Sequence, residues 1–345
     1  MLKKILALSL SVLTILGAFT ACGETTPAET TVPADVGPTE PAHEAKVLKV
    51  LTLGHSLSVD TGHMLNLVAA TEGIGDYDEI LIGTLYYSGC KLSQHVNFLQ
   101  ANSPEYRLYL SSTKTPNSPP ETMESVTMQD AIRFEYWDIF VMHGGSGENA
   151  VPAGLTNGNI QIIQDYVNKH KHNPTAIFAW HMAWVTPTDE ELLNMYPYTP
   201  NVHKDNYAKY NNDRATYYNA VTSATAECIV TDETFRFLIP TGTAMQNAWS
   251  SYMTEKDIHR DYGHATDMAR AMTSYVWYCK LMGIEKLEEI KLDAIPKVFL
   301  KSTADKTQDR VLTEAEKAVM LESINNALAH PLEMTQSQYT EAPAQ

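Results

Sequence analysis

A serine near the start of the chain and an aspartate–histidine pair near its end could together catalyse acyl transfer. Ser56 follows an apolar run that ends at Gly54, and Asp261-Tyr262-Gly263-His264 places a carboxylate three residues before an imidazole. A serine hydroxyl becomes a good nucleophile when a base takes its proton, and that base needs a group that orients it. The three side chains could therefore form a Ser-His-Asp triad. Alternatively, Ser56 or Ser58 only caps the helix that follows.

The Asp-x-x-His spacing does not by itself identify the pair, because Asp60-Thr61-Gly62-His63 has it too. Asp60 comes in the first turn after Ser56, where an acid that stabilises a helix N-terminus is the simpler interpretation. Asp261 and His264 follow the last expected strand and precede a long helix. Their position therefore favours them as the partners of Ser56. The chain contains no Gly-x-Ser-x-Gly sequence, which is typical of α/β-hydrolases.

Short apolar runs alternate with segments of helical periodicity along the chain. The runs that predict strands are Lys46–Leu53, Glu79–Leu85, Trp137–Met142, Thr175–Trp180 and Phe235–Ile239. Helices are expected near 64–70, 92–99, 160–167, 207–228, 268–282 and 314–329, the last with a Thr313-x-x-Glu316 capping box. The alternation predicts an α/β fold: a three-layer α/β/α sandwich with a five-stranded parallel sheet. Ligands bind such sheets beyond the carboxyl ends of the strands, where Ser56 falls.

Composition and charge exclude several classes of protein. The 345 residues include 25 Lys and Arg against 41 Asp and Glu, a net charge of −16, which argues against nucleic-acid binding. No Cys-x-x-Cys or His-Glu-x-x-His spacing supports a metal site, and no cofactor is expected. A metal-assisted hydrolase that uses the twelve histidines is the weakest alternative. No protein partner is implied.

The first residues are typical of an export signal. A basic start is followed by an apolar run over 5–21, and Phe19-Thr20-Ala21-Cys22 resembles a bacterial lipobox. We expect residues 1–22 to be a lipoprotein signal with lipidation at Cys22; an ordinary cleaved signal is the alternative. In residues 23–46, 17 of 24 positions are Thr, Pro, Ala or Glu, which predicts a disordered tether. The expected location is extracytoplasmic, with a lipid anchor in the bacterial cell membrane. Cys90, Cys228 and Cys279 then remain, enough for at most one disulfide.

Six sequence blocks, taken in order, resemble the SGNH (GDSL-like) hydrolase superfamily. They are similar to a bacterial branch of it with a GNSFS-like first block and an RDGxH-like last block. The blocks are VLTLGHSLS, YYSGCKL, WDIFVMHGGS, WHMAW, IPTGTAMQNAW and HRDYGHATDMARAM. The resemblance spans residues 47–283, which we take as an SGNH-like hydrolase domain. Residues 284–345 are then a partly helical C-terminal extension with a polar tail.

The resemblance implies roles for particular residues. Ser56 would be the nucleophile and His264 the general base, with Asp261 holding the imidazole. The backbone N–H groups of Ser56 and Gly89 would form part of the oxyanion hole. His143 would be the third donor, at a position where the branch tends to have Gln and the superfamily uses an Asn side chain. The implied activity is a serine esterase that hydrolyses an acyl ester, acetyl above all, on a carbohydrate or another small substrate.

Three tryptophans and the departures from the family pattern leave a second function open. Trp180, Trp184 and Trp249 fall near expected strand ends or in loops, where they could stack on sugar rings or else belong to the core or a lid. His55 stands where the family usually has Asn or Asp. Together with His143, it motivates the alternative of a non-catalytic glycan-binding lipoprotein on the same scaffold.

Overall fold

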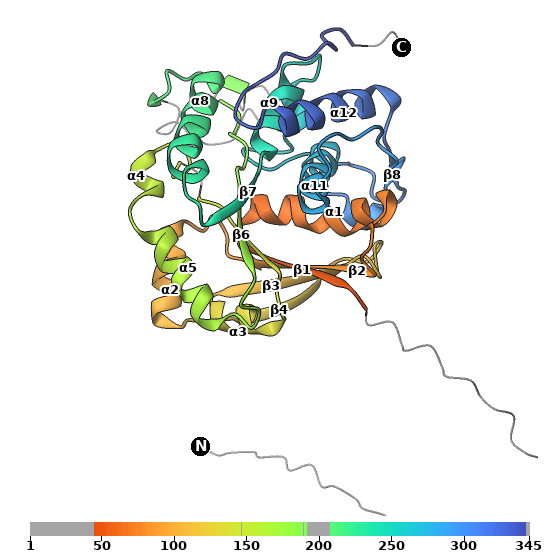
Figure 1. Ribbon diagram of the computed structural model, residues 1–345. Coiled ribbons are helices and arrows are strands. Elements are labelled where there is room, and N and C mark those ends of the chain that lie inside the picture. The colour runs from red at the N-terminus through yellow and green to blue at the C-terminus, as the bar shows by residue number, and fades with distance from the viewer. Residues whose placement is uncertain (1–44, 146, 189, 192–207, 343–345) are drawn as a thin grey trace, which may run out of the picture. The chain divides into compact units, whose positions relative to one another are not determined.

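A seven-stranded sheet forms the centre of the computed structural model, which describes residues 45–145, 147–188, 190–191 and 208–342 (Figure 1). The strand order is β4-β3-β2-β1-β5-β6-β7. The strands are β1 Val47–Gly54, β2 Glu79–Tyr86, β3 Tyr106–Ser112, β4 Glu121–Val126, β5 Ile139–Met142, β6 Ile177–His181 and β7 Phe235–Ile239. The predicted signal and all of the predicted tether except Ala45 and Lys46 lie outside the described residues.

The five expected strands all form, and they lie side by side and parallel as β2-β1-β5-β6-β7. The sheet has two strands more than predicted, because β3 and β4 add to it antiparallel beyond β2. Most residues of β4 are exposed and polar, so no apolar run marks it in the sequence. Such a strand at a sheet edge is held by backbone pairing rather than by burial.

Helices cover both faces of the sheet, which confirms the predicted α/β fold (Figure 1). β1 shows the alternation: Leu48 and Val50 pack into one core, and Leu51 and Leu53 pack into the other. One core contains α1 Ser56–Glu72, α9 Thr241–Trp249, α11 Asp267–Met282 and α12 Glu314–Ala329. The other contains α2 Leu92–Ala101, α3 Met128–Phe134, α4 Pro152–Leu155, α5 Asn159–His170 and α8 Arg214–Thr225. Shorter elements are the π-helix Ala226–Val230, α10 Glu255–Ile258, the 3₁₀ turn Lys297–Phe299, and strands β8 Ala294–Ile295 and β9 Arg310–Val311, which pair with each other.

The chain passes from β1 into α1 through a very close approach of backbone and side chains. A Cβ at Gly54 would lie 2.3 Å from both His143 Nε2 and Ser58 Oγ, so only glycine fits there. His55 is the N-cap of α1, and its Nδ1 accepts from the Leu57 N–H at 3.4 Å. Neither Ser56 nor Ser58 is therefore the cap, and Ser56 is the first residue of the helix.

Helices α1 and α11 pack against each other and join the two ends of the domain. Ser274 Oγ donates to Thr61 O at 2.7 Å, which fixes one helix against the other. α1 begins directly after the serine block, and α11 begins directly after Asp261–His264, with Thr266 as its N-cap. The helix pair therefore brings the first and last sequence blocks to the same edge of the sheet.

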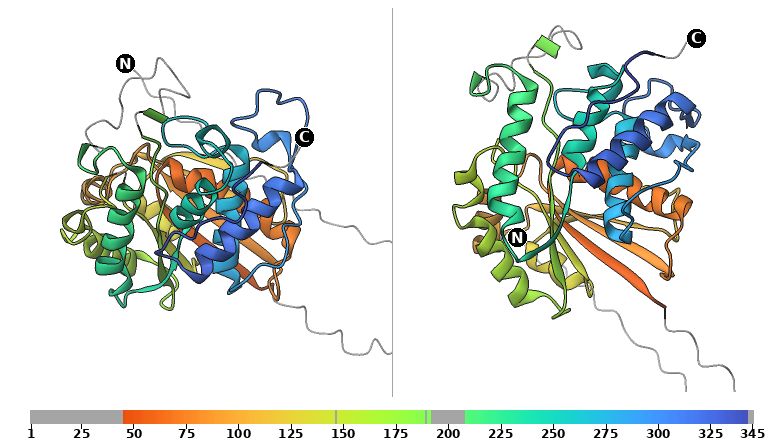
Figure 2. Two further views of the ribbon diagram at one scale, coloured as in Figure 1. Left: turned by 90° about the horizontal axis from the view of Figure 1, so that it is seen from above. Right: turned by 45° about the horizontal axis from the view of Figure 1, so that its top comes forward.

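The C-terminal residues belong to the same compact unit as the sheet. α12 begins with the predicted capping box of Thr313 and Glu316, and it packs on α9 and α11 (Figure 2). Val319, Met320 and Ile324 enter the α1–α11 core. The thiols of Cys90, Cys228 and Cys279 are all free. Among the described residues, no helix combines the length and the apolar character needed to cross a bilayer.

Candidate active site

A pocket of about 170 Å³ brings the predicted nucleophile and the predicted base together. It lies beyond the carboxyl ends of β1 and β2, as expected for a parallel sheet. Its lining consists of His55, Ser56, Leu57, Tyr86, Ser88, Gly89, Thr186, Tyr262, Gly263 and His264. Ser56, Gly89 and His264, which come from three separate sequence blocks, therefore share one small cavity.

Asp261 holds the imidazole of His264. Both carboxylate oxygens lie 2.8 Å from His264 Nδ1, and Asp261 Oδ1 also accepts the backbone N–H groups of Gly263 and His264. Burial alone would raise the pKa of Asp261, but the hydrogen bonds and the nearby imidazole outweigh it and lower this pKa to about 2. The ionised carboxylate keeps the proton of His264 on Nδ1, so Nε2 is the nitrogen that can accept a proton.

A small hairpin presents this pair. Arg260 N–H donates to His264 O at 2.9 Å, and His259 forms a β-bridge with Ala265. The Tyr262-Gly263 tip is tied down from outside, because Trp184 Nε1 donates to Gly263 O at 2.8 Å. The spacing of three residues between Asp261 and His264 is therefore the spacing of a closed turn.

Asp60 connects this hairpin to the helix that carries Ser56. Its oxygens lie 2.8 and 3.1 Å from the guanidinium of Arg260, and Oδ2 accepts the Ala265 N–H at 3.0 Å. The side chain is buried, with 4% exposed. The interpretation of Asp60 as a helix-terminus acid is therefore wrong, because its carboxylate is occupied by the residues on either side of Asp261–His264. A long-range ion pair of this kind leaves no local signal in the sequence.

The second Asp-x-x-His segment forms no pair of the catalytic kind. His63 is largely buried, and its ring packs edge-on against Tyr109 at 4.9 Å between centroids. Asp60 and His63 share neither a hydrogen bond nor an ion pair within the described residues. The choice of Asp261 and His264 by their place in the fold agrees with this geometry.

The backbone around Ser56 offers two donors to a developing negative charge. The N–H groups of Ser56 and Gly89 have no backbone acceptor in the described part of the chain. Gly89 turns the chain at φ +60°, and nothing lies within 4 Å of where a Cβ would be. The N-terminus of α1 adds the favourable end of its dipole. Donors of this kind stabilise the oxyanion of an acyl-transfer intermediate.

Ser56 Oγ and His264 make no hydrogen bond with each other among the described contacts. Both side chains line the same cavity, and His264 is only partly buried, with 20% of its side chain exposed. Catalytic hydrogen bonds are often long in the free enzyme and tighten when substrate binds.

His143 does not reach the pocket, so the prediction that it is the third oxyanion donor is wrong. The side chain is fully buried, and its Nε2 lies 2.7 Å from Ser58 Oγ and 3.3 Å from the His55 N–H. Burial, followed by the neighbouring imidazoles of His55 and His181, lowers its pKa well below the ordinary value. A neutral His143 accepts from His55 N–H and thereby holds the β1–α1 turn from below.

The three candidate tryptophans are core or supporting residues, the second of the two readings left open by the sequence. Trp180 is 1% exposed and packs against Phe235, and Trp184 holds the hairpin through Gly263. Trp249 stacks on His259, with the guanidinium of Arg214 over its ring at 3.6 Å. None of the three lines the pocket.

Several residues of the pocket were not predicted as site residues, among them Tyr86, Thr186 and Tyr262. Tyr86 ends β2, so its place at the carboxyl edge could have been found by the same rule that selected Ser56. Tyr262 lies inside the Asp-x-x-His motif, is 41% exposed, and packs edge-on against His264. Thr186 falls in an irregular segment after β6, where the sequence offers no signal.

The part of the chain that the structure describes contains no cluster of three or more His, Cys, Asp or Glu side chains arranged to hold a metal ion. The histidines around the site each make a separate structural hydrogen bond. His55 caps α1, His143 bonds Ser58, and His181 bonds the hydroxyl of Thr241 at 2.6 Å.

Comparison with known proteins places the fold. A family model described as a domain of unknown function, DUF4886, matches residues 49–297. The crystal structure of a DUF4886 family protein from Bacteroides uniformis ATCC 8492 at 1.50 Å resolution is 18% identical, with a TM-score of 0.67, and the match covers 86% of this chain and 100% of that one. A candidate SGNH hydrolase from Slackia heliotrinireducens is 14% identical with a TM-score of 0.41, over 68% of this chain and 100% of that one. No curated protein matches.

Proposed function

The chain belongs to the DUF4886 family, and from the geometry of its site we propose that it is a serine esterase that removes a small acyl group from a carbohydrate. One observation carries the proposal. Ser56, the Gly89 backbone and His264 line a single cavity, and Asp261 fixes the other nitrogen of that same imidazole. The order of the sequence blocks, which resembles the SGNH hydrolases, supports the same chemistry.

The mechanism follows from these positions. Ser56 Oγ attacks the ester carbonyl carbon while His264 Nε2 takes the hydroxyl proton, and the oxyanion forms against the N–H groups of Ser56 and Gly89. The C–O bond of the ester then breaks, and His264 returns the proton to the leaving alcohol. Water attacks the acyl-enzyme with His264 again as the base, which releases the acid and restores Ser56.

The size of the cavity supports a small acyl group. Its volume of about 170 Å³ is below the roughly 300–1,000 Å³ of typical ligand pockets. An acetyl ester fits this description, with the alcohol part of the substrate outside the cavity, near Tyr262 at its rim. The proposal also includes a carbohydrate substrate, an export signal and a lipid anchor at Cys22, and the support for these three features comes from the sequence alone.

The test is covalent labelling of the purified protein with a fluorophosphonate, followed by intact mass and peptide mapping. One adduct on Ser56 is expected. The Ser56→Ala variant should lose it, and the exposed Ser93→Ala should keep it. A folded wild-type protein that forms no adduct, or forms it elsewhere, would contradict the proposal. Glycan binding without turnover would then favour a non-catalytic lectin-like role.

A further inference from the structure

A second, larger pocket of about 640 Å³ lies against the hairpin that carries the catalytic pair. The hairpin contributes to both cavities: Arg260 and Asp261 line the larger one, and Gly263 and His264 line the catalytic one. Positive side chains stand out in the larger pocket, since Lys256, Lys301 and Arg310 join Arg260 there. Such a concentration is unexpected in a chain of net charge −16.

The carboxylates of this pocket already have partners. Asp257 accepts the N–H and the hydroxyl of Thr254, both at 2.8 Å, and so caps α10. Glu316 accepts the Thr313 N–H at 2.9 Å and pairs with Arg310, while Asp261 serves His264. None of these three carboxylates forms an ion pair with Lys256 or Lys301 among the described contacts.

The ammonium groups of Lys256 and Lys301 form no ion pair or hydrogen bond within the described residues. Burial, and then repulsion by Arg270 and Arg260, lowers the pKa of Lys301. Two ammonium groups without an ion-pair partner in one cavity favour the binding of an anion.

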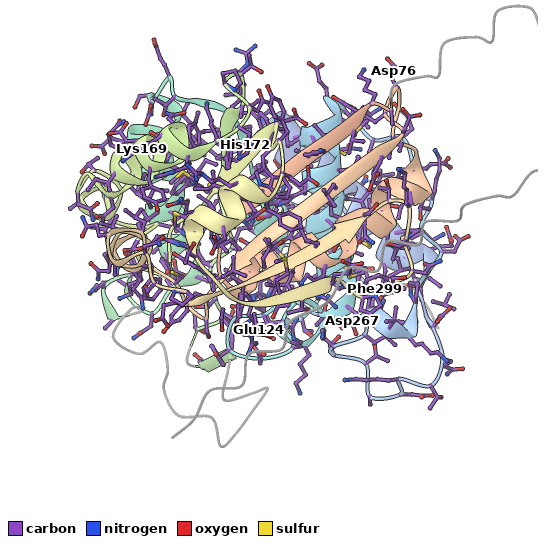
Figure 3. The ribbon with its side chains drawn as sticks, turned by 90° about the horizontal axis from the view of Figure 1, so that it is seen from below. Asp76, Glu124, Lys169, His172, Asp267 and Phe299 are labelled. Atoms are coloured by element: carbon purple, nitrogen blue, oxygen red, sulfur yellow. The ribbon has the colours of Figure 1, made fainter. Side chains whose placement is uncertain are left out.

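The loop that carries Lys301 is fixed rather than free. The carboxylate of Asp267 accepts the N–H groups of Lys301, Ser302 and Thr303 at 2.7, 3.0 and 2.9 Å, and it also accepts both hydroxyls. Arg270 donates to Asp267 and to Phe299 O, which lie next to each other in Figure 3. A ligand at Lys301 would therefore bind to a loop that is already ordered, so little conformational entropy of the backbone would be lost on binding.

Arg310 carries an unsatisfied donor at the same pocket. Its Nη2 pairs with Glu316, whereas Nη1 is buried and has no hydrogen-bond partner. The backbone of Arg310 is held by the pairing of β9 with Ile295 on β8. Buried donors without a partner are rare and costly in folded proteins. Arg310 is therefore part of the pocket wall, and its unpaired nitrogen lies behind the surface that a ligand would touch.

We propose that this pocket binds an oxyanion carried by the substrate, namely a carboxylate, sulfate or phosphate group. The inference rests on the esterase function proposed above for the adjacent cavity, and it specifies the substrate class as an acylated anionic glycan. Lys256 and Lys301 bind the anion in the pocket that Arg310 also lines, and the shared hairpin places it beside the ester that reaches Ser56. Lysine and arginine donors to an oxyanion form the stronger, charge-assisted kind of hydrogen bond.

The first experiment measures binding alone, so it does not depend on esterase activity. Sulfate, glucuronate and neutral glucose are titrated into the protein by calorimetry at low ionic strength. The wild type should bind both anions and not glucose, and Lys256→Gln/Lys301→Gln should bind them at least about tenfold more weakly. The control Lys169→Gln/Lys286→Gln removes two exposed lysines outside the pocket and should bind like the wild type; Figure 3 shows Lys169 away from Asp267.

Three binding results would overturn the inference: no anion binding by the wild type, equal weakening in the control variant, or binding of sulfate but not of glucuronate. The last result would indicate a site for free inorganic anions instead of a substrate group.

The second experiment compares two esters that differ by one charge, an O-acetylated methyl glucuronide and the matching O-acetylated methyl glucoside. The ratio of their kcat/KM values should favour the glucuronide in the wild type and fall about tenfold in the double variant. An unchanged ratio would overturn the inference while leaving the esterase function intact. Anion binding without hydrolysis of either ester would support the oxyanion site and contradict the esterase.

Discussion

Asp60 and Arg260 form a two-point ion pair across 200 residues of chain, with Oδ1–Nη2 at 2.8 Å and Oδ2–Nη1 at 3.1 Å. Asp60 comes one helical turn after Ser56, and Arg260 directly precedes Asp261. The pair therefore sets the position of the hairpin of residues 259–265 relative to Ser56, the proposed nucleophile. Arg270 adds a second cation to the same carboxylate, 3.6 Å from Asp60 Oδ1.

The first prediction concerns this ion pair. Asp60→Asn leaves Arg260 and Arg270 without their shared carboxylate, so the free energy of unfolding should fall by about 3 kcal/mol. The rate of fluorophosphonate labelling at Ser56 should also fall, because the hairpin loses its attachment to α1. The control is Glu124→Gln, which breaks the exposed Arg107–Glu124 pair at the sheet edge and should change neither quantity. A full labelling rate in folded Asp60→Asn would show that the pair does not position the base.

The second prediction concerns the proton on His264. Asp261→Asn can no longer hold the proton on Nδ1, and labelling of Ser56 should slow by about 10⁴-fold, as when the wrong tautomer forms in a triad. Because the pKa of Asp261 is lowered to about 2, its charge persists through mildly acidic conditions and does not shape the labelling rate above pH 4. Asp305→Asn, at an exposed acid that caps a turn, is the control. Equal rates for both variants would exclude a role for Asp261.

The third prediction tests the close approach beneath the nucleophile. A Cβ at residue 54 would lie 2.3 Å from His143 Nε2 and Ser58 Oγ, so Gly54→Ala should cost about 1–3 kcal/mol of stability and slow labelling of Ser56. The cost should be smaller in a His143→Ala background, where the added methyl group gains space. A double-mutant cycle from urea unfolding measures this coupling. Strictly additive effects would mean that the contact with His143 is not the cause.

The fourth prediction is a loss of stability in mild acid. His55, His143 and His181 follow or end β1, β5 and β6, with ring centroids 4.2 and 5.1 Å apart. Burial lowers the pKa of His55 to about 4 and that of His181 to about 3, from an ordinary 6.5. The unfolded chain therefore takes up protons first, so the stability that is present above about pH 6.5 is lost as the pH falls towards 4.

Each such histidine should contribute a slope of about 1.4 kcal/mol per pH unit in that range. Urea unfolding at pH 7.5, 6 and 5 measures the total slope. His181→Gln should reduce this slope by the contribution of one histidine. His172→Gln, which changes an exposed residue, should leave the slope unchanged. A slope that is the same in His181→Gln and the wild type would contradict the assignment.

The sequence predicted those features whose causes are local. The five parallel strands are runs of apolar residues, and the periodicity and capping residues of α11 and α12 can be recognised directly in the sequence. The strand-end rule placed Ser56 correctly at the sheet edge. Helix α9 was not predicted, because its polar and small residues, Thr241 to Thr243, are typical of a loop although they are buried here.

The features that sequence reasoning missed depend on contacts between distant segments. Asp60 looked like a helix-terminus acid because its partners are 200 residues away. His143 occupies the position of a donor in the chain, but the turn at Gly54 places its ring under the helix instead of in the cavity.

The packing of α1 on α11 also has a consequence for the order of folding. Ser56 and His264 come together only when the intervening segment of about two hundred residues forms a closed loop. The chain loses conformational entropy in that closure before the contacts between the two ends stabilise it. Local helices and the neighbouring β1–β2 pair can form earlier without the base. The pocket is therefore a late product of folding, and a nascent or partly folded chain carries a serine that is still inert.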